Sequence, residues 1–315
     1  MHTLRHLKLV RALANHRHFG KAAESLGVSQ PALTRSLRNL EESLGVRLFD
    51  RDGQVEPTVY GRIILERSGA IVTGFADLRR ELDLVRNLDV GTLTIGAGPY
   101  PAEISVHRAM GRLSQRYPHL HLTAAVKDWL DVVQDVRAGR TDVGIGDISG
   151  VTDDPDLDIE PVRQSPLRFF GRKGHPLTER KPLTLSDLCE YPWAGPRLPS
   201  AMRAFVEADR RPFAIYDPET GLVSPRLRLE TLQAIRQVVE SSDTISAAPD
   251  VLLADPAMTA AFALLPVEAP WLKLNYGFLW RRGRTLSPAA VAFMAEVRAV
   301  EAEATARLSS GGATG

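Results

Sequence analysis

The chain has 315 residues, of which 44% are hydrophobic and 24% charged, a globular composition long enough for two or three domains. Its formal net charge at pH 7 is +1, so no overall positive field indicates a nucleic-acid-binding protein. Cys189 is the single cysteine, which excludes an internal disulfide and a thiolate metal cage and favours a reducing compartment.

The first 60 residues differ from the rest in charge, with nine Lys and Arg against six Asp and Glu. A local excess of this kind can mark a nucleic-acid-binding end, although so small an excess is a weak signal. Arg, Lys and His interrupt the apolar residues of the first 20 positions, unlike a signal peptide or a membrane span. We therefore expect a cytoplasmic protein without membrane contact.

Three helices are predicted within this first part of the chain. The first covers 4–15, and the second is a short helix that Gly27 closes. The third covers 30–44 and ends before Gly45, another residue suited to a left-handed cap. A tight connector of three residues joins the second helix to the third.

The third helix begins with strong start signals and has two distinct faces. Ser29 can cap its free amides, and Pro31 falls in the first turn, where a missing N–H costs nothing. At about 100° per residue, one face holds leucines and the opposite face holds polar residues. The leucines are Leu33, Leu37, Leu40 and Leu44, and the opposite face holds Pro31, Thr34, Arg35 and Arg38.

A short helix, a tight turn and a second helix with exposed Thr and Arg match helix-turn-helix DNA recognition. The major groove admits one helix, and an Arg guanidinium can donate two hydrogen bonds to guanine. The alternative is a helical protein–protein module whose arginines face solvent. Two short strands around Asp52-Gly53 predict a hairpin with Arg51 at its tip, where it can reach the adjacent backbone or minor groove.

One long helical pattern without internal proline follows over 60–88. Its apolar positions alternate spacings of four and three, with Ser68 in the series, which is the heptad spacing of a coiled coil. A helix of this length between two globular parts favours pairing between chains over packing within one chain. The predicted dimer seam comprises Ile64, Ile71, Phe75, Leu78, Leu82 and Val85.

From residue 91 the pattern changes to alternating strands and helices, which predicts an α/β fold with parallel strands. A second α/β block begins at about Val162, so we expect two subdomains in this part of the chain. The predicted domains are a head over 1–60, a linker helix over 61–90, an α/β domain over 91–306 and a tail over 307–315 that is disordered by composition. Subdomain I covers about 91–161 and 268–306, and subdomain II about 162–267.

The stretch "FGKAAESLGVSQPALTRSLRNLEESLGVRLFDR" resembles the signature of LysR-type transcriptional regulators. The family pattern continues without a gap, and one departure follows it: the acidic residue at the start of the linker helix is missing, although Thr58 and Gly61 remain. The positions that fit are Phe19, Ala22, Ala23, Leu26, Val28, Ser29, Gln30, Ala32, Leu33, Thr34, Leu37, Leu40, Glu41, Leu44, Gly45, Leu48, Phe49 and Arg51.

The resemblance implies an all-α winged helix-turn-helix head, a dimerising linker helix and an α/β effector domain of two Rossmann-like subdomains, similar to type 2 periplasmic binding proteins. It implies a DNA-binding transcriptional regulator that acts as a homodimer or homotetramer on a dyad-symmetric promoter site and responds to a small-molecule effector. The implied contacts to base edges are Gln30, Pro31, Thr34 and Arg35, and those to phosphate or the minor groove are Ser29, Arg38 and Arg51.

The segment "GAGPYPAE", after the first α/β strand, predicts one wall of a small-molecule cleft. It is not a dinucleotide motif, since Pro101 occupies the third glycine position. We expect its backbone amides to face an anion, and the resemblance places the inducer at this loop. If Arg197 and Arg203 face the cleft, they favour an anionic effector; otherwise they are ordinary surface charges. We expect the effector to be an organic acid or an aromatic compound. The predicted effector-binding residues are Gly98, Pro99, Tyr100, Pro101, Asp147, Arg197, Ser200, Arg203 and Ser246.

No motif in the sequence indicates catalysis. The histidines form no ordered cluster, and no HExxH, GxSxG or P-loop pattern occurs. We therefore expect no enzyme activity, no cofactor and no metal. The alternative to a DNA-binding regulator is a cytoplasmic small-molecule sensor whose helical head binds a protein partner.

Overall fold

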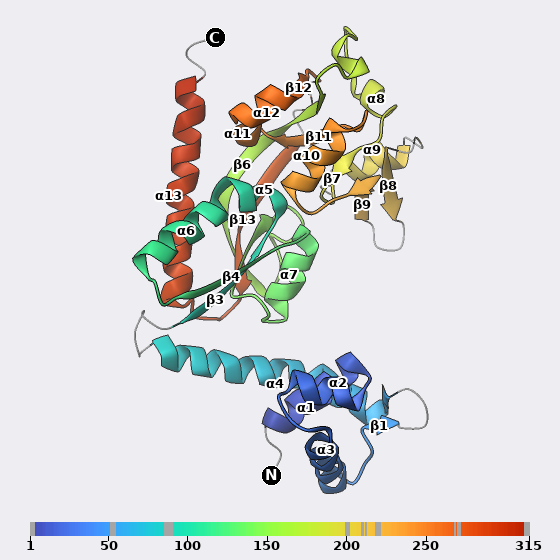
Figure 1. The fold of residues 1–315 in the computed structure, drawn as a ribbon, viewed down its shortest axis with the longest axis vertical. Coiled ribbons are helices and arrows are strands. Elements are labelled where there is room, and N and C mark those ends of the chain that lie inside the picture. The colour runs from blue at the N-terminus through green and yellow to red at the C-terminus, as the bar shows by residue number, and fades with distance from the viewer. Residues whose placement is uncertain are drawn as a thin grey trace. The chain divides into compact units, whose positions relative to one another are not determined.

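The structure is a computed structural model that describes residues 4–50, 55–84, 91–198, 202–208, 211, 213–217, 222–267, 269 and 272–311. The chain divides into two compact units, Met1–Asp83 and Leu84–Gly315 (Figure 1). The first unit is helical with a small hairpin, and the second is built on a mixed sheet.

Three short helices form the head of the first unit: α1 (Leu4–His16), α2 (Phe19–Ser25) and α3 (Gln30–Leu44). These bounds confirm the three predicted helices to within a residue or two. The helices surround one apolar core, and its largest members are fully buried. That core contains Leu9, Val10, Leu13, Ala22, Ala23, Leu33, Leu37, Leu40, Leu48 and Phe49.

The helix ends in the head follow from local chemistry. Ser29 Oγ accepts from the Ala32 amide at 3.4 Å, which caps the start of α3. Gly27 and Gly45 have φ angles of 65° and 70°, the left-handed conformation that ends a helix at little cost for glycine. The cap of α2 is His18, whose Nδ1 accepts from the Gly20 amide at 3.1 Å; this cap is not predictable from the usual N-cap residues, which are Ser, Thr, Asp and Asn.

The predicted hairpin is present as β1 (Phe49–Asp50) and β2 (Glu56–Pro57), which pair antiparallel. A buried carboxylate joins it to the head, because Glu41 Oε1 on α3 accepts from the Leu48 amide at 2.8 Å. Arg51, predicted at the hairpin tip, lies outside the described residues.

The long helix α4 (Val59–Leu84) starts directly after the hairpin. Thr58 Oγ1 accepts from the Gly61 amide at 3.2 Å and so caps the helix even without the acidic residue of the family pattern. A Cβ on Gly61 would lie 2.2 Å from the Leu48 carbonyl oxygen, so only glycine allows this close approach. The start of the linker helix is therefore intact.

A seven-stranded sheet organises the second unit. The strands β3 (Thr92–Ala97), β4 (His121–Val126) and β5 (Val143–Asp147) are parallel, as the alternating pattern predicted. Their neighbour β13 (Lys273–Arg281) is antiparallel to β5 and to the next strand, β6 (Leu157–Arg172). The order is β11-β6-β13-β5-β3-β4, and β12 pairs with β6.

The strand β6 joins the two subdomains. Its first half pairs with β13, and its second half pairs with β11 (Ser246–Pro249) and β12 (Phe262–Leu265). At a bulge at Tyr276/Gly277 of β13, the backbones of β13 and β6 lie very close together. A Cβ on Gly277 would lie 2.4 Å from the Glu160 carbonyl oxygen.

Helices cover the sheet of subdomain I on both faces. Figure 1 shows α6 (His107–Arg116) beside α13 (Pro288–Gly311), with α7 (Trp129–Arg137) on the opposite face. The tail predicted as disordered from 307 instead continues α13 to Gly311, because extending a helix already formed over the preceding Ala-rich residues costs little. The remaining elements are α5 (Pro99–Pro101), η1 (Ala102–Val106), η2 (Pro176–Thr178), α8 (Leu185–Leu188), β7 (Ala194–Gly195), α9 (Arg203–Ala208), β8 (Ala214–Asp217), β9 (Leu222–Pro225), β10 (Leu227–Arg228), α10 (Leu232–Glu240), α11 (Asp250–Leu253) and α12 (Pro256–Ala261).

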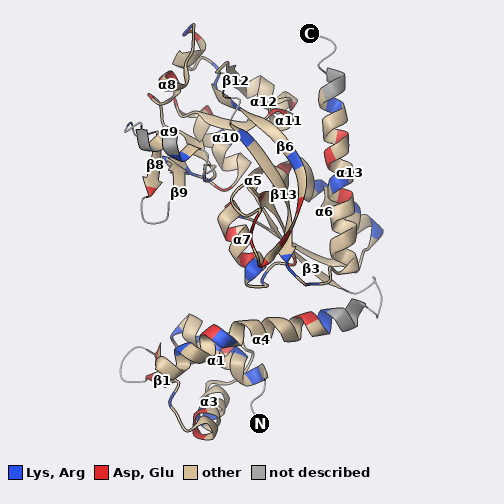
Figure 2. Cartoon of the chain, turned by 180° about the vertical axis from the view of Figure 1, so that it is seen from behind, with Lys and Arg blue, Asp and Glu red and all other residues tan. Residues whose placement is uncertain are grey.

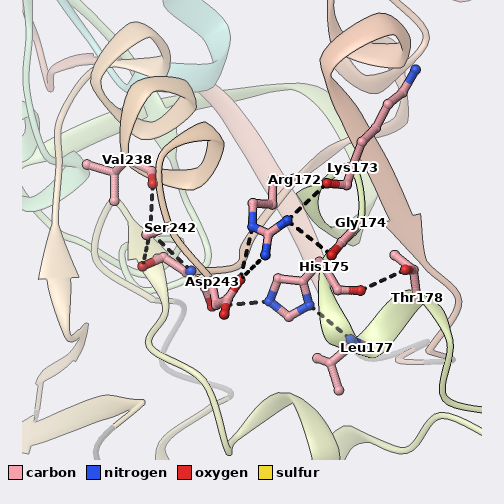
Figure 3. Close-up of polar contacts among 10 residues, drawn as sticks. Arg172, Lys173, Gly174, His175, Leu177, Thr178, Val238, Ser242 and Asp243 are labelled. Atoms are coloured by element: carbon pink, nitrogen blue, oxygen red, sulfur yellow. Dashed lines mark hydrogen bonds and ion pairs between the residues drawn. The ribbon is translucent and has the colours of Figure 1, made fainter.

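A polar cluster fixes the outer end of β6 in subdomain II (Figure 3). His175 has no exposed surface; its Nδ1 accepts from the Leu177 amide, and its Nε2 lies 3.1 Å from the Asp243 carbonyl oxygen. Arg172 Nη2 lies 2.7 Å from the Asp243 carboxylate. These bonds join β6 and η2 to the turn after α10.

Candidate functional site

The helix α3 presents one polar face to solvent. Its leucines Leu33, Leu37 and Leu40 are buried, with exposed fractions of 3% or less. Leu44 is 36% exposed, so of the four predicted leucines it alone lies outside the core of the head. On the other face, Ser29, Gln30, Pro31, Arg35 and Arg38 are exposed and Thr34 is half-buried, so the structure brings the predicted DNA-contact residues of this helix together.

The two arginines of this face differ in their contacts. Arg38 Nε donates to Glu42 Oε1 at 2.7 Å, one turn further along the helix. Such an exposed pair is worth about 0.3–0.5 kcal/mol and separates easily. Arg35 makes no ion pair with any residue in the described ranges. It is therefore the arginine of α3 most ready to bind an external anion or a base.

Charged residues of both signs are interspersed along each unit (Figure 2). This agrees with the formal net charge of +1. Attraction of a polyanion to the head must therefore depend on local arginines, because long-range steering by the whole molecule is small.

The helix α4 carries an exposed apolar stripe. Ile71, Phe75 and Leu78 are 55%, 44% and 50% exposed, and their spacing places them on one side of the helix. Ile64, the first residue of the predicted seam, packs partly against the core of the head. The side chain of Leu82 and all of Val85 lie outside the described residues. Large apolar side chains in a row are usually covered by another chain.

A cavity lies between the two subdomains of the second unit, at the end of the parallel strands. Of the predicted effector-binding residues, Gly98, Pro99, Tyr100, Pro101, Asp147, Arg197 and Ser246 line it. Its volume is about 60 Å³, well below the roughly 150 Å³ of a cavity that holds benzene. Apolar side chains that the sequence analysis did not single out form most of the wall: Trp129, Leu167, Phe169, Trp193, Leu198, Met202, Leu272 and Leu274.

Two direct contacts bridge the subdomains across this cavity. The hydroxyl of Tyr100, on subdomain I, donates to the Ala247 carbonyl oxygen on β11 at 2.6 Å. Burial raises the pKa of Tyr100 above its ordinary value, so the hydroxyl stays protonated and remains a donor. The second contact joins Arg197, which follows β7, to Asp128 at the start of α7, with Nε 3.3 Å from Oδ1.

The charge of Arg197 is therefore matched within the protein. Asp128 has no exposed surface and also accepts from the Arg197 amide at 3.2 Å, while Arg197 is 11% exposed. Arg203 does not line the cavity; its guanidinium lies over the Tyr216 ring, 5.0 Å from the centroid. Ser200 lies outside the described residues.

Two further polar residues of the cavity wall, Asp147 and Ser246, take no part in the two contacts that bridge the subdomains. Burial raises the pKa of the Asp147 carboxyl, although Asp147 Oδ1 accepts from the Ser149 amide at 2.7 Å. Ser246 is 3% exposed, and its Oγ has no hydrogen-bond partner among the residues that the structure describes. A buried hydroxyl without a partner is uncommon and indicates a place for a ligand atom or water.

Metal sites and membrane-spanning helices are both absent from the described part of the chain. No group of three or more His, Cys, Asp and Glu side chains there could hold a metal ion. No helix within the same residues is long and apolar enough to cross a membrane.

Two family profiles match this chain. The profile of bacterial regulatory helix-turn-helix proteins of the lysR family matches residues 4–62, and that of the LysR substrate binding domain matches residues 86–302. The chain belongs to the LysR family. It is therefore a LysR-type transcriptional regulator with an N-terminal helix-turn-helix domain and a substrate-binding domain.

Curated relatives match this LysR-family chain over nearly its whole length. The SDS degradation transcriptional activation protein of Pseudomonas sp. (strain ATCC 19151) is 37% identical over 302 residues, 93% of this chain and 94% of the relative. The HTH-type transcriptional regulator GbpR of Azospirillum brasilense is 32% identical and covers 94% of this chain and 86% of its own length.

The LysR fold also extends to solved structures. Full-length CbnR, in a complex with its target DNA, matches with a TM-score of 0.60 and 20% identity, over 95% of this chain and 100% of that chain. At this identity the likeness establishes the fold: a winged helix-turn-helix head, a linker helix and an α/β domain of two subdomains.

Proposed function

We propose that this LysR-type regulator binds double-stranded DNA through α3, pairs with a second chain through α4, and binds a small effector in the cavity between its α/β subdomains. Its place of action is the cytoplasm, on a dyad-symmetric promoter site. The observation that carries the proposal is the polar face of α3, with exposed Gln30 and Arg35 beside a capped helix start.

The chemistry of this face suits the major groove. The side chains of Gln30 and Arg35 can each make two hydrogen bonds to base edges, Gln to adenine and Arg to guanine. Ser29 and Arg38 lie beside them and suit the phosphate backbone, Arg38 after releasing Glu42. The burial of Leu37 under this face holds the helix rigidly in the head. CbnR, which shares the fold, is known in a complex with its target DNA.

The exposed stripe on α4 supports a dimer. Two stripes that contain Ile71, Phe75 and Leu78 can cover one another in a coiled coil, which removes these side chains from water. Two chains related by a dyad place two heads on the half-sites of a symmetric DNA site. Tetramers built as dimers of dimers would extend the same arrangement.

The cavity supports a mechanism for the response. A ligand the size of an aromatic ring exceeds a cavity of about 60 Å³. Its entry would widen the cleft and break the hydrogen bond between Tyr100 and Ala247. The ligand would thereby stabilise an open arrangement of the two subdomains and shift the population between two geometries of the paired heads.

The test is a gel-shift and footprinting experiment with the full-length chain and the intergenic DNA upstream of its own gene. The wild-type protein should protect a dyad-symmetric site with an affinity that falls as salt rises. Arg35→Ala should weaken specific binding by about 5- to 150-fold, the value of one good base contact of 1–3 kcal/mol, and leave non-specific binding nearly unchanged.

The matched control is Arg108→Ala, which removes an exposed arginine of α6, outside the head. It should bind the site as the wild type does. Equal specific affinity of wild type and Arg35→Ala would refute base reading by this residue. Absence of any sequence-preferring binding would refute the DNA-binding proposal and favour a head that binds a protein partner.

A further inference from the structure

The helix start at the cavity offers few donors to an anion. A helix N-terminus attracts anions through its free amides, but Pro99 and Pro101 have none. The amides of Gly98 and Ala102 already donate to the carbonyls of Ile145 and Gly98. From 98 to 102, therefore, at most the amide of Tyr100 remains for a ligand.

The ionisable groups at the cavity add to this disadvantage for an anion. The positive charge of Arg197 is matched by the fully buried carboxylate of Asp128. Asp147 supplies another carboxylate to the same wall, and no second arginine lines the described cavity. These three side chains sum to a negative charge when Asp147 is ionised, so a second anion would be repelled and poorly solvated.

The remaining wall suits an apolar body. Trp129, Phe169 and Trp193 contribute aromatic rings, and Leu167, Leu272 and Leu274 contribute aliphatic groups. Burial of an alkyl chain or aromatic ring against them is favourable at about 25 cal/mol per Å². A ligand would gain most of its affinity from this surface and its orientation from the few polar groups.

The polar groups that could orient it are Ser246 and Asp147. Ser246 Oγ is buried at the wall without a partner among the described residues. A Cβ built on Gly195 would lie 3.8 Å from Ser246 Oγ and 3.9 Å from the Tyr100 hydroxyl, so the absence of a side chain there keeps this corner open. A ligand hydroxyl can both accept from Ser246 and donate to a carboxylate, whereas a ligand carboxylate can only accept.

We infer that the effector of this regulator is an uncharged alcohol or phenol with an apolar body, held by a hydrogen bond to Ser246. The inference rests on the proposed function only in placing the effector in this cavity. It replaces the anionic effector that the arginine pattern of the sequence suggested, since Arg197 is neutralised and Arg203 lies away from the cavity.

The test compares matched uncharged and anionic probes by calorimetry and thermal shift on the full-length protein. The pairs are benzyl alcohol with benzoate and 1-hexanol with hexyl sulfate. We expect each alcohol to bind at least about tenfold more tightly than its anionic partner, because the anion loses hydration without gaining a counter-charge. Ser246→Ala should weaken alcohol binding by about 2- to 12-fold, the value of one hydrogen bond.

Two further variants test whether the cavity residues set the preference for an uncharged ligand. Ser114→Ala removes an exposed serine hydroxyl on α6, away from the cavity, and should leave every affinity unchanged. Asp147→Asn removes the negative charge while keeping an acceptor for the Ser149 amide. It should reduce the difference in affinity between each alcohol and its anionic partner.

Tighter binding of the anions would overturn the inference, as would absence of binding by both alcohols up to their solubility limits. Equal alcohol affinities for Ser246→Ala and wild type would show that Ser246 does not bind the alcohol. The gel shift with promoter DNA is independent of these results, so failure here and failure of the DNA-binding proposal can be told apart.

Discussion

The tautomer of His175 follows from its two neighbours. Nδ1 faces the Leu177 amide and must accept, so the proton lies on Nε2 and is donated to the Asp243 carbonyl (Figure 3). Burial lowers the pKa of His175 below its ordinary value of 6.5. A protonated ring would present Nδ1–H to an N–H, so the folded structure strongly prefers the neutral form.

We predict that this histidine weakens the fold in acid. Below about pH 6.5 the unfolded chain binds a proton that the folded chain resists. The contribution to stability is complete above that pH and is lost as pH falls, by about 1.4 kcal/mol per pH unit down to the folded pKa. Urea denaturation at pH 5, 6 and 7 measures it by tryptophan fluorescence.

The comparison variant is His175→Asn, in which an amide oxygen can still accept from Leu177 but no group titrates. It should be less stable at pH 7 and should show a flatter dependence of unfolding free energy on pH. His107→Asn, at a half-exposed histidine, should retain the wild-type slope. An identical slope for wild type and His175→Asn would assign the acid sensitivity to other groups.

Single residues were predictable where their role is local. Ser29, Gly27 and Gly45 act within one helical turn, so their capping follows from the sequence alone. The partner of Arg197 was not predictable, because Asp128 lies far away in sequence and only the tertiary fold brings them together. The same holds for Tyr100, whose hydroxyl reaches a carbonyl in the other subdomain.

At the scale of elements, α4 is the helix whose amphipathic pattern is not satisfied within the described chain. Phe75 is 44% exposed at the middle of the stripe, and its neighbours Ile71 and Leu78 are exposed to a similar degree. A charge placed between two such helices would be buried without a partner, which is costly. The opposite side of the helix tolerates a charge in water.

We therefore predict that Phe75→Glu dissociates the oligomer into single chains while its helix content stays near that of the wild type. Multi-angle light scattering gives the mass, and far-ultraviolet circular dichroism gives the helix content. Ala76→Glu places the same charge at an exposed position on another face of α4 and should leave the mass unchanged. An unaltered mass for Phe75→Glu would mean that this stripe does not join chains.

The order and type of the main elements were predictable, but some lengths were not. The full length of β6 was not predictable, because Pro161 and Pro166 interrupt it and proline argues against a strand. In the fold both prolines lie in that strand opposite β13. Likewise, the helical stretch before α6 begins at Pro99, a start that is hard to predict although proline is tolerated in a first turn.

The apolar wall of the cavity shows the same limit at a larger scale. Large aromatic residues such as Trp129, Phe169 and Trp193 are also common in ordinary cores. The neighbouring sequence does not distinguish a side chain that fills a core from one that lines a cavity. The separation appears only when β6 and β13 set the two subdomains opposite each other. The loops after the strands therefore indicated where a cleft could lie, but the sequence did not show that the wall of the cavity is mostly apolar.

At the scale of the whole molecule, the division at Asp83 and Leu84 separates two units with independent cores. Leu37 belongs to the core of the head, and Leu113 belongs to the core of the α/β unit; neither has exposed surface. Each loses contacts in its own core when truncated to alanine, at a cost of about 2–5 kcal/mol.

We predict that heating the full-length protein gives two calorimetric transitions that respond separately to these truncations. Leu37→Ala should lower the transition of the head by at least about 8 °C, and Leu113→Ala should lower that of the larger unit by at least about 4 °C. The smaller unit shifts more for the same free energy because its unfolding entropy is smaller.

Each variant serves as the control for the other, since the transition of the untouched unit should stay within about a degree of the wild type. A single transition that both variants lower together would show that the units unfold as one. In that case an effector that stabilises the α/β unit would also stabilise the head, and the response could be transmitted in this way. Two separate transitions would require the effector signal to pass through the position of the linker helix, because stability gained in the α/β unit would not reach the head.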